Sequence, residues 1–193
     1  LGSPNEVTAG NIREMTARGF AYCGTQWIGM AAPDIPVVAA LLQDFSLFPA
    51  LPDRMQQSFV QFLFLGRAMI HPDGLAADPA FQDGDGGPLL DVDAGLAFDG
   101  NSQGGIAGGA LTALAQDFTN AVLGVTGMNY STLLDRSVAF EQFRAFLHPA
   151  YPDPLDRQVV ISLAQMLWDR GESNGYAHHM TDDPLPGTPA HRV

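Results

Sequence analysis

The feature that most constrains this chain is a G-x-S-x-G turn formed by Gly100, Ser102 and Gly104. Residues 94–99 before it form a short, mostly apolar segment, as in a buried strand. Residues 105–114 after it are small or apolar and favour a helix packed tightly on a sheet. A sharp turn from strand to helix forces strained backbone angles on the serine, and small neighbours let the two elements approach. The sequence therefore predicts an α/β fold organised around this turn.

The tip of the turn carries the candidate chemistry. Ser102 is expected to project its hydroxyl above the sheet edge, beside the first turn of the helix. There the backbone N–H of Gln103 and the helix dipole would face an oxyanion that forms when the serine attacks a carbonyl. Two other interpretations stay open: an ordinary glycine-rich loop, or a loop that binds phosphate at the helix N-terminus. No Lys or Arg lies near the turn, which weighs against phosphate.

Together with residues 122–130 and 165–171, the turn resembles a little-characterised group of bacterial α/β-hydrolase proteins, and the resemblance extends from Leu1 to Val193. It implies a three-layer sandwich with a mainly parallel sheet, and a serine esterase or lipase-like hydrolase acting on esters or related acyl compounds. It also implies a Ser–acid–His triad in that chain order. A helical cap insertion is expected over residues 128–188. Only Ser102, as nucleophile, and Gln103, as oxyanion donor through its backbone N–H, are carried over.

We expect the chain to be an internal fragment, a single truncated domain over residues 1–193. It has no starting Met, and the turn that supplies the second oxyanion N–H in this superfamily normally precedes such a segment. The other end stops where the next strand should begin, near His191. The triad acid and histidine are then expected beyond Val193. The alternative is a small complete domain.

The charge of the chain excludes some partners. Its net charge is −12 and its isoelectric point is about 4.4, whereas nucleic acids and anionic membranes require clustered Lys and Arg. No apolar stretch is long enough to span a membrane, and the single cysteine, Cys23, cannot form an internal disulfide. We expect a small acyl substrate, no cofactor and no nucleic acid. The compartment is not predicted; a signal peptide before Leu1 would make the protein secreted or periplasmic.

Hydrophobic spacing and turn residues predict the other elements. Helices are expected at 5–17, 34–44, 53–70 (capped by Asp53), 140–147 and 155–170, and strands at 20–23 and 120–125.

Several polar residues are weaker candidates. His178 and His179 could reach the serine from a folded-over loop, but a histidine pair alone is no metal site, so no metal is predicted. Asn129 and Asp135 follow the second strand, where some α/β-hydrolases carry the triad acid. The acidic residues of 83–94 fail the calcium-loop pattern, which needs Gly at position 6 and Glu at position 12.

The main rival is a non-enzymatic α/β-hydrolase-like binding or structural domain that keeps the turn for reasons of folding. A cofactor-binding module is a third interpretation. Among enzymes, esterase, lipase, peptidase and thioesterase are not separated, although the apolar cap-like segment, with Met166 and Trp168, favours an apolar acyl chain. The oligomeric state is not predicted.

Overall fold

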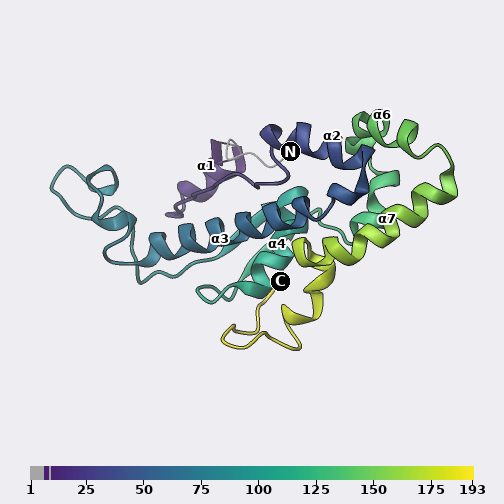
Figure 1. Ribbon diagram of the computed structural model, residues 1–193. Coiled ribbons are helices and arrows are strands. Elements are labelled where there is room, and N and C mark those ends of the chain that lie inside the picture. Colours follow the sequence, from purple (N-terminus) through teal and green to yellow (C-terminus); the bar gives the residue numbers. More distant parts are fainter. Residues whose placement is uncertain (1–6, 9) are drawn as a thin grey trace.

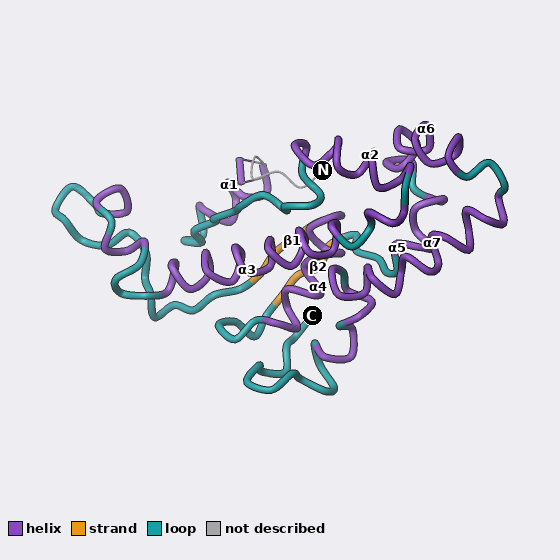
Figure 2. Tube along the Cα trace, viewed as in Figure 1, coloured by secondary structure: helices purple, strands orange, loops and turns teal. Residues whose placement is uncertain are grey.

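The fold is mixed α/β, with a small parallel sheet surrounded by helices (Figures 1 and 2). The computed structural model describes residues 7–8 and 10–193. Strand β1 (Phe98–Asn101) pairs in parallel with β2 (Ala121–Gly124), and helix α4 (Gln103–Leu114) connects them. The helix after the turn and both strands were predicted. The first strand begins later than expected, because residues 94–97 have no ladder partner among the described residues.

A third segment adds to the sheet on the other side of β2. Asn120 and Arg192 form a parallel bridge. The Ala121 N–H donates to the Arg192 carbonyl over 2.9 Å, whereas the Asn120 carbonyl accepts from Phe98 N–H on the β1 side. Strand β2 is therefore central, as in a sheet whose next strand begins near His191.

The long helix α3 (Ala50–Ile70) runs through the middle of the molecule and packs against α4 and α7 (Pro154–Trp168) (Figure 1). Helix α2 (Ile35–Gln43) packs on α6 (Glu141–Ala150) at one end. These helices meet in one apolar core. Its largest fully buried side chains are Phe48, Phe59, Leu41, Leu51, Met55, Leu111, Leu147 and Ile161.

Two predictions in the first third of the chain were wrong. Helix α3 begins before Asp53, because Pro52 fits in a first turn where no N–H partner is needed. Asp53 instead pairs with Arg170 over 2.6 Å. Residues 20–23 form no strand, since their backbone pairs with no strand in the described chain. Helix α1 (Gly10–Thr16) matches part of the helix predicted at 5–17, of which residues 5, 6 and 9 lie outside the described part.

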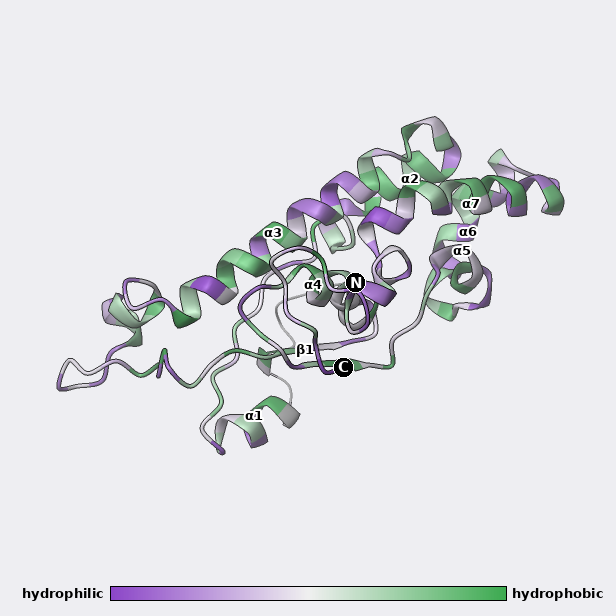
Figure 3. Ribbon diagram, turned by 90° about the horizontal axis from the view of Figure 1, so that it is seen from below, coloured by the Kyte–Doolittle hydropathy of each residue, from purple (hydrophilic) through white to green (hydrophobic). Residues whose placement is uncertain are grey.

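The segment between β2 and Arg192 is mostly helical up to His179, and residues 180–191 form turns and a loop. It contains α5 (Tyr130–Leu133), α6 and α7, along which apolar and polar residues are interspersed (Figure 3). Short 3₁₀ helices link the elements throughout: Ala32–Asp34, Phe45–Leu47, Leu75–Ala77, Pro79–Phe81, Leu134–Arg136, Val138–Phe140, Asp169–Gly171, Ser173–Gly175 and Ala177–His179. None of the described helices has the length and apolar character needed to cross a bilayer.

Glycines allow α4 to lie directly on the sheet. A Cβ on Gly100 would sit 2.6 Å from the Gly104 carbonyl oxygen, and one on Gly105 would sit 2.7 Å from the Gly124 carbonyl oxygen. Both oxygens belong to backbone that cannot move aside. A Cβ on Gly104, in contrast, would meet only Trp27 Nε1 at an ordinary 3.7 Å. The close approach therefore depends on Gly100 and Gly105. The pattern G-x-S-x-G predicts that both of its glycines, Gly100 and Gly104, are needed for this approach, and for Gly104 that prediction was wrong.

Two neighbouring substitutions in α4 should have opposite effects. Gly104→Ala should leave stability unchanged or raise it by up to about 1 kcal/mol, the usual helix gain of alanine over glycine. Gly105→Ala should lower it by about 1–3 kcal/mol, because the new methyl group overlaps the Gly124 carbonyl. Urea denaturation of both variants measures the difference. Equal effects would contradict this account of the helix–sheet contact.

Candidate active site around Ser102

Ser102 has a backbone conformation that few non-glycine residues adopt. Its φ is 53° and its ψ is −114°, and its N–H donates to the Gly124 carbonyl over 3.0 Å. Val125, which follows that carbonyl, also has a positive φ, of 43°. These are the two non-glycine residues with positive φ in the described chain. Strain of this kind costs about 1–3 kcal/mol and clusters at functional sites.

The first turn of α4 offers unpaired donors beside Ser102. The first bond of the helix runs from Ile106 N–H to the Ser102 carbonyl, over 2.9 Å. The N–H groups of Gln103, Gly104 and Gly105 precede this bond and have no partner within the helix. The Ser102 hydroxyl does not cap them, and it makes no hydrogen bond to any described residue. A partial positive charge and free donors therefore lie next to a free hydroxyl.

A second backbone segment, residues 28–31, lies close to the turn but is organised by a buried carboxylate. Asp34 is 2% exposed and accepts from the N–H groups of Gly29, over 2.7 Å, and Ala31, over 3.0 Å. Arg54 from α3 pairs with the same carboxylate. The charged pair thus fixes this loop to the central helix.

The other two N–H groups of this loop are also paired. Ile28 N–H donates to Ser58 Oγ over 3.1 Å, and Met30 N–H donates to the Trp27 carbonyl over 2.9 Å. The loop therefore forms part of the wall of the site but offers no unpaired N–H group that could donate to an oxyanion.

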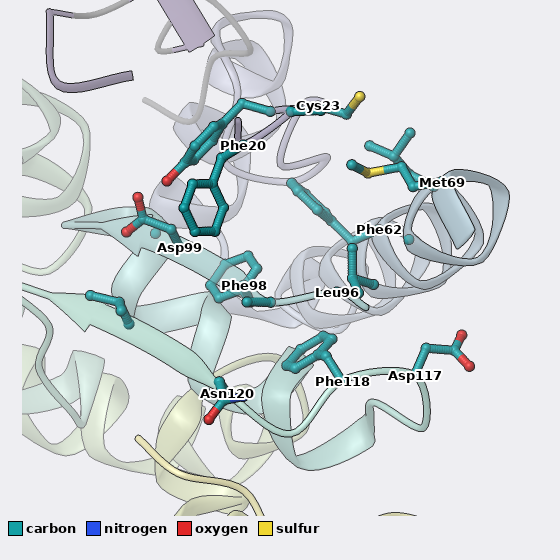
Figure 4. A pocket seen from close by; sticks show the side chains of 18 of the residues that line it. Phe20, Cys23, Phe62, Met69, Leu96, Phe98, Asp99, Asp117, Phe118 and Asn120 are labelled. Carbon is teal, nitrogen blue, oxygen red and sulfur yellow. The ribbon is translucent and has the colours of Figure 1, made fainter. Parts of the chain in front are cut away.

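Two cavities meet at Ser102 and Gln103. The larger, about 1820 Å³, runs along β1 beneath the N-terminal segment. Figure 4 shows Phe20 and Cys23 on one side of it and Phe98 on the other. Burial raises the pKa of the Cys23 thiol, which keeps it protonated and a poor nucleophile.

The smaller cavity, about 430 Å³, has mainly apolar walls. They come from α2, from loop 29–31, from residues 133–143 and from the turn after β2. Trp168, which also packs in the core, lines it as well, whereas Met166 is 76% exposed and does not.

Tyr130 connects the turn at Ser102 to the helical segment. Its hydroxyl donates to Gln103 Oε1 over 2.6 Å, and its ring stacks on Trp168 with centroids 4.4 Å apart. Burial raises the pKa of Tyr130, so the hydroxyl stays a donor. Two buried N–H donors of this cluster, Gln103 Nε2 and Trp168 Nε1, have no partner among the described residues.

Behind Tyr130 lies a fully buried carboxylate, Glu172. It accepts from Tyr130 N–H over 2.9 Å and from Gln165 Nε2 over 2.6 Å. Burial raises the pKa of Glu172, and these hydrogen bonds only partly offset it. The sequence analysis missed both Tyr130 and Glu172, because their roles depend on contacts between residues about 30 to 40 positions apart.

The histidines near the end of the chain lie away from Ser102. Arg192, next to His191, pairs with Asn120 at the start of β2, whereas Ser102 donates to the carbonyl of Gly124 at its end. Asn120 and Gly124 are four residues apart, which at about 3.3 Å per residue is about 13 Å along the strand. His191 is buried against Phe118, with ring centroids 5.6 Å apart, and its N–H donates to Met180, which follows His178 and His179.

His178, His179 and Asp183 place one ligand atom each within 4.8 Å of one another. The sequence analysis predicted no metal and did not include Asp183. Two of these three residues are exposed, and none of the three lines either cavity at Ser102.

Asn129 and Asp135, the two candidates after β2 for the triad acid, are not hydrogen-bonded to Ser102 in the described chain. Asn129 caps α5, accepting from Thr132 N–H over 3.2 Å and from two hydroxyl groups. The side chain of the exposed Asp135 forms no ion pair among the described residues, and its carbonyl accepts from Arg144.

Comparisons with profiles of known families, with curated proteins and with solved structures found no match.

Removing the Tyr130 hydroxyl should destabilise the protein. Tyr130→Phe leaves Gln103 Oε1 without its donor, which should lower the free energy of unfolding by about 1–3 kcal/mol. Tyr22→Phe is the control, because Tyr22 is only partly buried and its hydroxyl faces the exposed Asp99, so its loss should matter less. Similar losses in both variants would show that the Tyr130–Gln103 bond is not important for stability.

Glu172 should make stability depend on pH. Because its pKa in the folded state is raised above the ordinary 4.5, the folded protein holds a proton that the unfolded chain has lost. Stability should therefore fall as the pH rises from about 4.5 through the raised value. Glu172→Gln should remove this fall, and Glu141→Gln, at an exposed position, should keep it. Denaturation curves from pH 5 to 8 measure it; parallel profiles for all three proteins would refute the assignment.

Proposed function

We propose that this chain is part of a serine hydrolase of the α/β-hydrolase type, acting on esters or related acyl compounds through Ser102. The observation that carries the proposal is the strained backbone of Ser102 at a strand-to-helix turn. The finer fold, a three-layer sandwich with residues 128–188 as a cap, belongs to the same proposal. Its support is the parallel pairing of β1, β2 and Arg192 with a helical segment between the last two.

In this mechanism the Ser102 hydroxyl attacks the acyl carbonyl. The N–H of Gln103, with its neighbours in the first turn, stabilises the oxyanion, and one such donor is worth about 3 kcal/mol in the transition state. A histidine must accept the serine proton and an acid must orient that histidine. No described histidine is hydrogen-bonded to Ser102, and this observation favours the second candidate, a non-enzymatic binding domain that retains the turn.

Fluorophosphonate labelling read by mass spectrometry distinguishes the two candidates. The hydrolase proposal predicts labelling confined to Ser102, lost in Ser102→Ala and unchanged in His191→Ala, because His191 lies at the other end of the sheet. No labelling of this chain, natively folded, and none of a chain extended at both ends would favour the binding domain. A loss of labelling in His191→Ala would contradict the placement of that histidine.

A further inference from the structure

Resting on the proposed function, we propose that the 430 Å³ cavity binds the apolar acyl chain of the substrate, with Val38 of α2 in its wall. The ligand class is an ester with an alkyl acyl group.

The position of the cavity supports this assignment. Ser102 and Gln103 line it, so a carbonyl at the serine can continue directly into it. Its size lies within the range of about 300–1,000 Å³ typical of small-molecule sites. Its walls beyond the serine are largely aliphatic and aromatic, among them Val38, Leu42 and Phe143.

Unpaired donors on the wall give a second, independent indication of a ligand. Gln103 Nε2 and Trp168 Nε1 are buried without a partner among the described residues, although buried N–H groups are normally paired. Both residues line this cavity. The oxygens of an ester bound at Ser102 offer an acceptor to the neighbouring Gln103, which neither a purely hydrocarbon ligand nor a cation could do.

Two pairs of neighbouring residues allow a matched test. Val38 lines the cavity, whereas Val37 is exposed and does not. Ala139 lines it, whereas Val138 is 85% exposed and does not. Tryptophan at Val38 or Ala139 should fill the cavity, and tryptophan at Val37 or Val138 should not.

The probes are uncharged 2-alkanones from pentanone to tridecanone, which carry a carbonyl and a linear chain but cannot be hydrolysed. Calorimetric titration of the 193-residue chain should show a Kd that falls about fourfold per added methylene and then levels off. Val38→Trp should weaken binding of the long ketones at least tenfold and move the plateau to shorter chains, and Val37→Trp should not. If Val38→Trp fails to fold, Ala139→Trp and Val138→Trp provide the same comparison.

A Kd independent of chain length, or equal effects of tryptophan at the lining and non-lining positions, would overturn the acyl-chain assignment. Fluorophosphonate labelling of the same sample tests the hydrolase proposal separately. Chain-length-dependent ketone binding, with no labelling of this chain or of one extended at both ends, supports the cavity assignment while the hydrolase fails. Labelling without such binding overturns the cavity assignment while the hydrolase stands.

Discussion

The structure depends on the close contact between α4 and the parallel strands beneath it. Because Gly100 and Gly105 have no side chains, the helix begins directly above the carboxyl ends of the parallel strands β1 and β2. That contact holds Ser102 in its strained conformation and points the free N–H groups of the first helical turn to the same side. A larger side chain at either glycine would separate helix and sheet and remove both features together.

The surroundings of the turn are held by buried polar groups. Asp34 and Arg54 fix one wall of the small cavity to α3, and Glu172 and Tyr130 fix the opposite wall to Gln103. A buried acid is tolerated only when its oxygens are paired. Asp34 is paired with Arg54 and two backbone N–H groups, whereas the hydrogen bonds of Glu172 only partly offset its burial. The shape of the cavity is therefore determined by a few long-range hydrogen bonds between elements far apart in sequence.

The local part of this arrangement could be predicted from the sequence. The turn, α4, β2, α2 and α7 have clear patterns of glycine, proline and apolar spacing. The strand predicted at residues 20–23 was wrong, because an apolar, aromatic run predicts a strand whether or not a partner strand lies beside it. The helix cap predicted at Asp53 was wrong, because an aspartate can also form an ion pair, here with Arg170. Tyr130 and Glu172 could not be predicted, since no local pattern reports contacts made across the fold.

The glycine content of α4 also bears on how the chain folds. Gly104, Gly105, Gly108 and Gly109 fall within 12 residues, and each glycine inside a helix costs about 1 kcal/mol relative to alanine. Such a short helix is not stable alone and forms only against its partners, which include Ser173, far along the chain. In a partly folded chain the serine therefore lies in a relaxed, flexible segment without aligned donors. The strained conformation of Ser102 and the aligned N–H groups beside it would then form only together with the packing of α4 on its partners.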